Sequence, residues 1–373
     1  MTAGAATGDV LTRRALNRAT LARQGLLQRW QIPALEAIER LVGLQAQTPH
    51  SWYVGLWARL EGFRPEDAAD LLTARAIVRM ALMRSTIHLV TARDCLALRP
   101  LVQPVIERSV RGQFGRRLAG LDRDEVAAAA RALVEERPLT FAELTGLLAE
   151  RFPGRDAFAM GQAVRAWLPL VQVPPRGVWG VSGPIAHTSA EAWLGRPLDP
   201  DPSLAELVLR YLAAFGPASV KDVQTWSGLT RLREVIEPLR PRLVVFHDEQ
   251  GRELFDLPEA PRLDPQTPAP PRFLYDYDNL LLSHADRSRV VTEAYGQQGF
   301  APDGPQPSAV LLDGFTAATW TIERQRGAAT LTIRPFRRLS AQETAGLTDE
   351  GARLLAFAAA DAPDHDIRFV PPA

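Results

Sequence analysis

The chain has 373 residues, of which 46% are hydrophobic and 23% are charged, and this composition excludes an intrinsically disordered chain. At roughly 150 residues per domain, the length predicts two or three domains, enough to bury sizeable cores. The formal net charge is zero, but residues 1–120 hold 17 arginines against 9 acidic residues, so we expect this third of the chain to face a polyanion.

The rarer residue types argue against several kinds of site. Cys95 is the only cysteine, which excludes an intrachain disulfide and indicates a reducing compartment. The six histidines lack paired ligand spacing, so we expect no metal and no other cofactor. The N-terminus lacks the pattern of a secretory signal, and no apolar run reaches ~18 residues. We therefore expect a cytoplasmic protein without a membrane partner.

The first 120 residues have the pattern of a helical block followed by a strand pair. Apolar residues at helical spacing predict helices within 10–60 and a short helix at 68–75. Two apolar, β-prone runs predict strands at 77–83 and 86–91.

Two segments in the middle of the chain resemble each other. In each, a hydroxyl residue stands three positions before an acidic one, Thr140 before Glu143 and Ser219 before Asp222. This spacing is typical of a capping box at the start of a helix. The elements expected around these two starts are helices at 125–136, 157–168, 204–215 and 232–239, and strand pairs at 170–173 with 178–181 and at 243–247 with 253–256.

Three helices followed by a two-stranded wing make a winged-helix module. We therefore predict an α+β protein with three such modules in tandem, then a proline-rich linker and a β-rich C-terminal segment that ends as a meander, with strands at 309–314, 317–324 and 328–335. The expected boundaries are 1–120, 121–202 and 203–257 for the modules, 258–272 for the linker and 273–373 for the C-terminal segment.

The sequence lacks the short motifs of the common catalytic classes, such as a phosphate-binding loop or a metalloprotease helix. One candidate segment is Gln45-Ala46-Gln47, although the pattern of two glutamines is weak evidence by itself. It stands just before Thr48-Pro49, where the chain is pushed toward extended geometry. In an extended segment two glutamines at i and i+2 share a side, and their amides could hold one water molecule between them. The alternative is that they only cap a helix end.

Four ordered blocks resemble the AlkZ-like family of bacterial DNA glycosylases. They are LVGLQAQTPHSWYVGLWARL at 41–60, MRSTIHLV at 83–90, LLSHADRSRV at 281–290 and VLLDGFTAATW at 310–320. The resemblance covers essentially the whole chain. It implies a C-shaped monomer of tandem winged helices that binds double-stranded DNA and removes N7-alkylated guanine, including interstrand crosslinks made by natural-product genotoxins.

The resemblance also implies catalytic roles for Gln45 and Gln47, which match the two glutamines of the family's Gln-apolar-Gln motif. Glutamine at the second position aligns the chain with the self-resistance branch rather than with the branch that has aspartate there. An N7-alkylguanine already carries positive charge, so two oriented amide dipoles can replace the usual carboxylates. A lyase step would need an amine, and Lys221 is the only lysine, in an expected helix of the third module. We therefore predict a monofunctional enzyme.

Several residues are candidate DNA contacts. Arg324, Gln325 and Arg326 form the tip of the expected hairpin, which resembles the family's DNA-engaging hairpin, although such tips are often only solvated. Each of the other candidates could instead have a purely structural role, in an ion pair, as a hydrogen-bonded histidine or as ordinary exposed surface. They are Arg287 and Arg289 beside Asp286, His284, and Arg84 with His88 on the first wing. Trp52, Tyr53 and Trp57 could stack on a base, but their helical spacing favours the core.

Two other functions stay open at this stage. The chain could be a winged-helix regulator that binds DNA without catalysis, or an inactive relative that senses damage. A regulator usually reads paired half-sites as a dimer, and the sequence has no heptad repeat or obvious dimerisation helix. We therefore favour the enzyme and expect a monomer.

Overall fold

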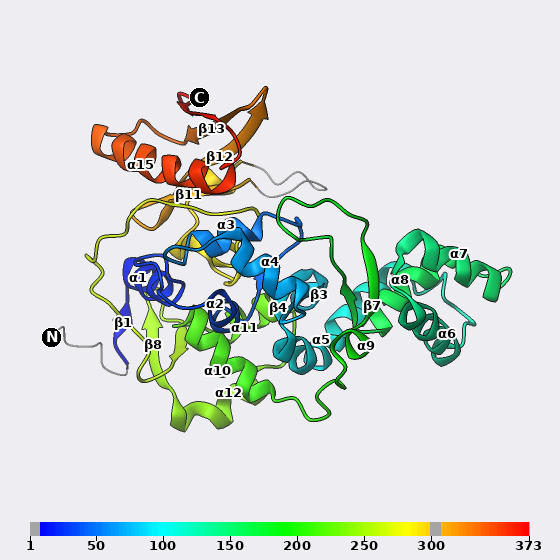
Figure 1. Cartoon of the computed structure of the whole chain (residues 1–373). Helices are drawn as coiled ribbons and strands as arrows, with labels where there is room; N and C mark the ends of the chain where they lie inside the picture. The colour runs from blue at the N-terminus through cyan, green and yellow to red at the C-terminus, as the bar shows by residue number, and fades with distance from the viewer. Residues whose placement is uncertain (1–7, 299–306, 373) are drawn as a thin grey trace.

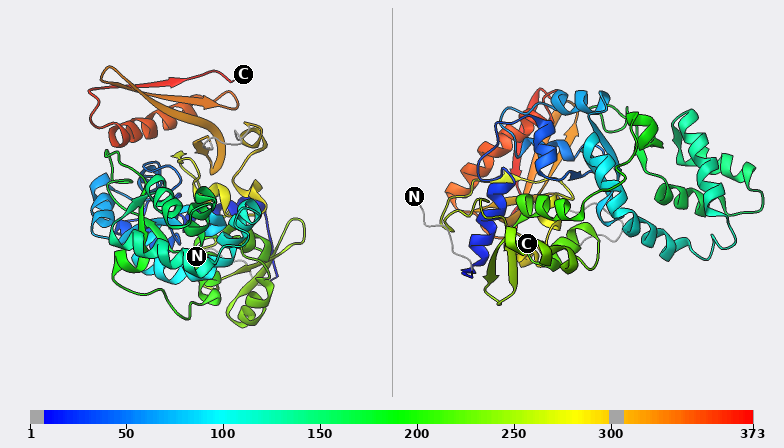
Figure 2. Two further views of the ribbon diagram at one scale, coloured as in Figure 1. Left: turned by 90° about the vertical axis from the view of Figure 1, so that its right-hand side faces the viewer. Right: turned by 90° about the horizontal axis from the view of Figure 1, so that it is seen from below.

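The computed structural model describes residues 8–298 and 307–372 and has the α+β class that the sequence predicts (Figure 1). The helices within 123–167 stand apart at one side of the molecule, and the C-terminal sheet with its helix lies at the top of Figure 1. Figure 2 shows the same separation from two further sides. The number of winged-helix modules and the C-shaped outline stay predictions.

The N-terminal part contains the expected helices and strand pair, followed by a long helix at 92–114 that the sequence does not predict. Thr12 begins the first long helix by accepting a hydrogen bond from the Ala15 amide, and Thr91 begins the last one in the same way. The elements are β1 (Val10–Leu11), α1 (Arg13–Arg23), α2 (Ala34–Arg40), β2 (Leu44–Gln45), α3 (Trp52–Trp57), α4 (Pro65–Thr73), β3 (Ile77–Ala81), β4 (Ile87–Thr91) and α5 (Ala92–Phe114), with one 3-10 turn at Met83–Ser85.

The middle part contains one strand that the sequence misplaces. The capping box of Thr140 and Glu143 is confirmed, but the partner of the strand at 170–172 lies at 186–189 and not at 178–181. Positive φ angles at Gly177 and Gly180 break the backbone of the expected strand into turns. The elements are α6 (Arg123–Glu136), β5 (Leu139–Thr140), α7 (Phe141–Arg151), α8 (Ala157–Trp167), β6 (Leu170–Gln172), β7 (Ala186–Ser189) and α9 (Ala190–Leu194).

One six-stranded sheet joins these two parts, with the strand order β2-β4-β3-β6-β7-β5. The contact between the parts is the antiparallel pair β3–β6, in which Arg79 lies opposite Gln172. Gln172 in turn lies opposite His187 of β7. The expected wings of the first two modules are therefore continuous with each other.

The third part follows its predicted pattern closely. The capping box of Ser219 and Asp222 is confirmed, and β1 adds to this part as a strand parallel to β8 in the order β1-β8-β9. The elements are α10 (Leu204–Phe215), α11 (Val220–Ser227), α12 (Arg233–Ile236) continued by a 3-10 segment (Glu237–Arg242), β8 (Val244–Asp248) and β9 (Glu253–Asp256).

The proline-rich segment 258–271 has neither helix nor strand and lies along α1. Arg14 Nε donates to the Pro265 carbonyl at 2.7 Å, and Arg18 Nε donates to the Thr267 carbonyl at 2.7 Å. Arginines of α1 therefore satisfy backbone acceptors that no secondary structure pairs.

The three strands that the sequence predicts within 309–335 pair antiparallel in consecutive order, as a meander, but the C-terminal segment does not end with them. Ser340 and Glu343 form a capping box that begins an 18-residue helix, and the last strand returns parallel to β13. A parallel pair needs such a crossover, whereas a meander is antiparallel throughout. The elements are β10 (Arg272–Phe273), α13 (Asn279–Leu282), a 3-10 turn (Arg287–Arg289), α14 (Glu293–Gly296), β11 (Ala309–Leu312), β12 (Phe315–Gln325), β13 (Ala328–Pro335), α15 (Ala341–Ala358) and β14 (Asp364–Phe369).

The hydrophobic clusters cross the expected boundaries. The largest cluster joins buried residues within 21–89 to buried residues within 273–359. A second cluster joins residues within 42–106 to residues within 207–255, and a third holds α6, α7 and α8 together. The C-terminal segment therefore packs directly against the part that carries the two glutamines, although the division into modules stays a prediction.

Candidate active site

The backbone of Gln45 is held between β4 and the C-terminal segment. Gln45 lies on β2 opposite His88, and its amide donates to Asn279 Oδ1 at 3.0 Å. Its carbonyl oxygen accepts a hydrogen bond from the Tyr275 hydroxyl at 2.9 Å. Gly43, directly before this strand, has a positive φ, and a Cβ there would lie 2.7 Å from the Leu89 carbonyl oxygen. The short strand β2 is therefore fixed in place from both sides.

The side chain of Gln45 is buried, with 4% of its surface exposed, and its Oε1 accepts a hydrogen bond from Arg84 Nη2 at 2.6 Å. A guanidinium can only donate, so this contact fixes which end of the amide is the oxygen. The second terminal nitrogen of Arg84 donates to the Trp226 carbonyl oxygen. Burial lowers the pKa of Arg84 to about 10, so the group keeps its charge at neutral pH.

Gln47 is exposed, and its Oε1 accepts a hydrogen bond from the Ile87 amide at 3.2 Å. Between the glutamines, the Ala46 amide donates to the Ile87 carbonyl at 2.7 Å, and the Ala46 carbonyl accepts from Arg79 Nη2 at 2.7 Å. Both glutamine oxygens therefore meet groups of residues 84–87, one side chain inside the protein and the other at its surface.

His88 lies in the interior beside Gln45. Its Nδ1 is 3.0 Å from the Thr86 carbonyl oxygen, and burial together with the charge of Arg84 lowers its pKa to about 3. The imidazole is therefore neutral at physiological pH. The sequence predicts His88 on an exposed wing, either as a DNA contact or as ordinary surface. Its side chain is buried, so neither interpretation describes its position.

A pocket of about 210 Å³ opens beside Gln47. It lies between the turn that joins β3 to β4, the helices α5 and α8, and the strands β6 and β7. The polar side chains in its lining are Gln47, Ser85, Ser109, Gln113, Gln162, Arg165, Gln172 and His187. None of these was singled out by the sequence except Gln47, because the pairing of β3 with β6 brings distant segments together.

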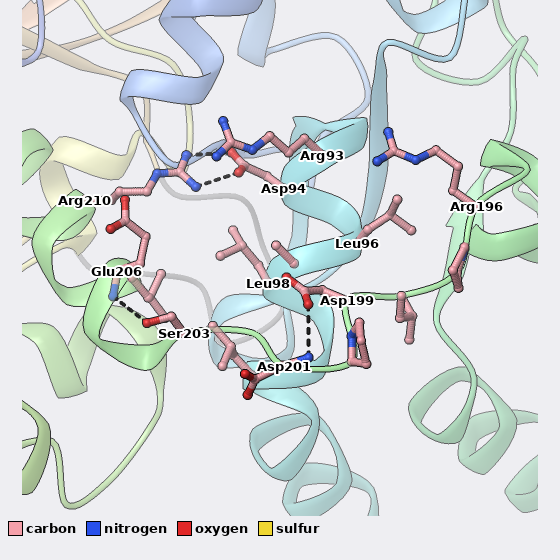
Figure 3. A pocket seen from close by; sticks show the side chains of 16 residues that line it. Arg93, Asp94, Leu96, Leu98, Arg196, Asp199, Asp201, Ser203, Glu206 and Arg210 are labelled. Carbon is pink, nitrogen blue, oxygen red and sulfur yellow. Dashed lines mark hydrogen bonds and ion pairs between the residues drawn. The ribbon is translucent and has the colours of Figure 1, made fainter.

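A larger cleft of about 510 Å³ between α5 and α10 contains neither glutamine (Figure 3). Figure 3 shows Arg210 turned toward Asp94, and its two terminal nitrogens donate to the two carboxylate oxygens at 2.6 and 2.7 Å. The charges of Arg210 and Asp94 are therefore paired within the protein. No feature of the described residues in this cleft indicates a part in the hydrolysis predicted for the two glutamines.

The hairpin residues Arg324, Gln325 and Arg326 are exposed at the tip of β12 and β13. Arg324 Nη1 lies 2.8 Å from both carboxylate oxygens of Asp361, so its charge is shared with a surface partner. The position of the tip allows contact with DNA, and the contact itself stays a prediction.

The residues of the 284–289 block lie largely inside the protein. His284 Nε2 is 3.0 Å from the Phe215 carbonyl oxygen, and Arg289 Nη1 donates to the Pro217 carbonyl at 2.9 Å. Both side chains are buried, which fits the structural alternative and not a phosphate contact. Arg287 is half-buried, and Asp286 pairs with Arg252 at 2.6 Å.

The aromatic residues after the glutamines belong to the core, as their spacing predicts. Trp52 and Tyr53 are fully buried and stack at 3.8 Å between ring centroids, and Trp57 is 8% exposed. In the described part of the chain, no cluster of three potential metal ligands occurs. Among the same residues, no helix is both long and apolar enough to cross a bilayer.

Comparisons with known proteins agree with the resemblance seen in the sequence. Curated proteins give no match. Among solved structures, the DNA glycosylase AlkZ of Streptomyces sahachiroi has a similar fold, with a TM-score of 0.76 and 20% identity over 97% of this chain and 100% of that chain. The family model described as DNA glycosylase AlkZ-like matches residues 38–357, which include both glutamines. The chain therefore belongs to the AlkZ-like DNA glycosylase family and is a hydrolase of N-glycosyl bonds in DNA.

Proposed function

We propose that the protein is a monofunctional glycosylase that hydrolyses the N-glycosidic bond of N7-alkylated guanine in double-stranded DNA. The proposed substrates include bulky adducts and interstrand crosslinks from natural-product genotoxins. Their removal repairs the DNA of a cell that produces or meets the genotoxin and makes that cell resistant. The observation that carries the proposal is the hydrogen bond of Arg84 to the buried Gln45 amide, directly beside the exposed Gln47.

The chemistry suits two neutral amides. Alkylation at N7 makes the base cationic, so the base leaves without being protonated. As the glycosidic bond breaks, its electron pair goes to the base, the anomeric carbon takes the oxygen of a water molecule, and the proton of that water goes to solvent. Gln47 is the group at the surface that orients this water, and the contact with Arg84 holds the Gln45 amide in one fixed orientation close by.

The proposed enzyme leaves an abasic site and does not cut the strand. A lyase step needs an amine that forms a Schiff base with the sugar. The single lysine, Lys221, is exposed on α11 and does not line the pocket beside Gln47. Arg324, Gln325 and Arg326 of the hairpin are the proposed DNA contacts, together with Arg287, whereas the buried His284 and Arg289 are no longer proposed. Arg84 is proposed to position Gln45.

The test is to incubate the purified protein with a duplex that carries one 7-methylguanine, and with a duplex crosslinked through guanine N7. We expect release of the free base and a strand that breaks only after alkaline treatment. Tight binding of the duplex without base release would instead identify a regulator or a damage sensor. Strand cleavage without alkali would contradict the monofunctional assignment.

A further inference from the structure

Two buried polar side chains in the pocket beside Gln47 contribute no hydrogen bond to the fold. Gln172 and His187 lie opposite each other on β6 and β7, and each is only 6% exposed. Gln172 Oε1 is fully buried without a hydrogen-bond partner, and within the described residues the His187 ring makes no hydrogen bond either. Buried polar groups are nearly always paired, so the unpaired Gln172 Oε1, with the His187 ring beside it, points to a ligand.

The pocket has the size and polarity of a site for one flat heterocycle. Its volume of about 210 Å³ is below the ~300–1,000 Å³ that drug-sized ligands occupy. The walls combine apolar side chains, such as Met80 and Phe114, with amides and hydroxyls. Burial lowers the pKa of His187 to about 4, so its ring is neutral and offers one donor and one acceptor.

We infer that this pocket receives a small N7-alkylguanine that is not crosslinked, after it swings out of the helix, and that Gln172 and His187 hydrogen-bond its polar edge. The inference rests on the proposed function and names the place where its substrate base is held. A glutamine amide has a donor and an acceptor in one plane, which matches the alternating donors and acceptors along a guanine edge. Gln47 at the rim of the same pocket then lies next to the sugar of the extruded nucleotide.

The charges around the pocket favour bond cleavage. Among the described residues that line the pocket, Arg165 is the only charged one, and none carries a carboxylate. The base is cationic while it is attached to the sugar and becomes neutral when the electron pair of the glycosidic bond passes to it. As the positive charge moves from the base to the sugar, the repulsion between Arg165 and the bound base falls on the way to the transition state, which lowers the barrier.

The experiment compares the wild type with Gln172→Leu, His187→Phe and the double variant. Free 7-methylguanine is titrated into each protein by calorimetry, and excision of 7-methylguanine from a duplex is followed under single-turnover conditions. We expect wild-type binding of the free base and a weakening of about tenfold or more in the double variant, with a matching loss of excision rate. The matched controls, Gln250→Leu on the exposed β8–β9 turn and His247→Phe on β8, retain both properties.

Thermal unfolding of the same variants separates a ligand site from a structural role. Because neither side chain donates or accepts a hydrogen bond within the fold, apolar replacements leave the unfolding temperature unchanged or raise it. A double variant that unfolds at a clearly lower temperature would overturn the inference. A wild type that does not bind the free base, or variants that bind it equally well, would also overturn it.

The titration with free base and the excision assay test the inference and the proposed function separately. The titration needs no catalysis, so a wild type that binds the free base but releases none from DNA contradicts the proposed function and leaves the base pocket standing. A wild type that excises the base, with variants that bind and excise as it does, leaves the glycosylase standing and removes the pocket.

Discussion

At the scale of single residues, Arg84 has the most constrained position near the glutamines. It has a φ of 55°, a left-handed conformation that arginine rarely adopts. Its guanidinium bridges the Gln45 amide and the Trp226 carbonyl, which ties the β3–β4 turn to the end of α11. Unusual backbone angles of this kind persist when the surrounding contacts hold them and often accompany functional sites.

This geometry predicts that Arg84→Ala lowers the single-turnover excision rate by about 10- to 100-fold with little change in DNA affinity, because the Gln45 amide loses its orientation. Arg84→Lys recovers only part of the rate, since an ammonium cannot bridge both acceptors. The check is a double-mutant cycle with Gln45→Ala. If Arg84 acts through Gln45, removing it from the Gln45→Ala enzyme costs no further rate, and fully additive losses would contradict this role.

The candidate site could be predicted only in part from the sequence. The Gln45-Ala46-Gln47 segment is local, so its spacing and its family resemblance are visible in the chain. The contact with Arg84 depends on the pairing of β2 with β4, and the pair of Gln172 and His187 depends on the pairing of β6 with β7. Which residues of two distant strands lie opposite each other cannot be predicted from any short stretch of sequence.

At the scale of elements, α3 supports β2 through a close approach at Gly55. A Cβ at this position would lie 2.6 Å from Tyr275 Cε1, and the hydroxyl of the same tyrosine donates to the Gln45 carbonyl. Gly55→Ala therefore pushes the ring away from β2. We expect a loss of about 1–3 kcal/mol in the free energy of unfolding, together with slower excision.

Gly146→Ala is the matched control for this prediction. Gly146 is an exposed helix residue of α7, and a Cβ there has no atom within 4 Å. Alanine favours a helix over glycine, so this variant gains about 0.5–1 kcal/mol and keeps its activity. Chemical denaturation measures both variants, and a Gly55→Ala protein as stable as the wild type would show that α3 does not brace β2.

Elements with strong local signals were predictable and others were not. Thr140 and Ser219 begin helices in capping boxes, as their spacing indicates. The helix α5 lacked such a clear pattern because Pro100 and Pro104 lie inside it. The strand at 186–189 and the crossover helix α15 were missed because pairing with distant strands defines them.

At the scale of the whole molecule, the N-terminal and C-terminal parts share one hydrophobic cluster, which includes Leu44 and Ala46 beside the glutamines. Several histidines are enclosed in this architecture without their charge. Burial is the main cause that lowers the pKa of His88 to about 3 and of His187 to about 4, and it lowers the pKa of His284 in the same way. All three therefore stay neutral in the folded protein at mildly acidic pH.

These pKa values predict that the protein loses stability as the pH falls from about 6.5 toward 4.5. In this window the unfolded chain binds protons on histidines that the folded chain keeps neutral, so acid favours unfolding. Carboxylates with lowered pKa, such as Glu143, add to the loss only below about 4.5. Urea unfolding at pH 7 and pH 5 measures the effect. His187→Phe makes the dependence shallower, and a stability that is flat or rises on acidification would contradict the prediction.

The most direct measurement is the single-turnover release of 7-methylguanine by Gln45→Ala, Gln47→Ala and the double variant, with duplex binding measured in parallel. We expect each single variant to lose about 10²-fold or more in rate, the double variant to release no detectable base, and all three to bind the duplex as the wild type does. Gln250→Ala, on an exposed turn, keeps the full rate. A double variant that still releases the base at the wild-type rate would show that the two amides do not catalyse the reaction.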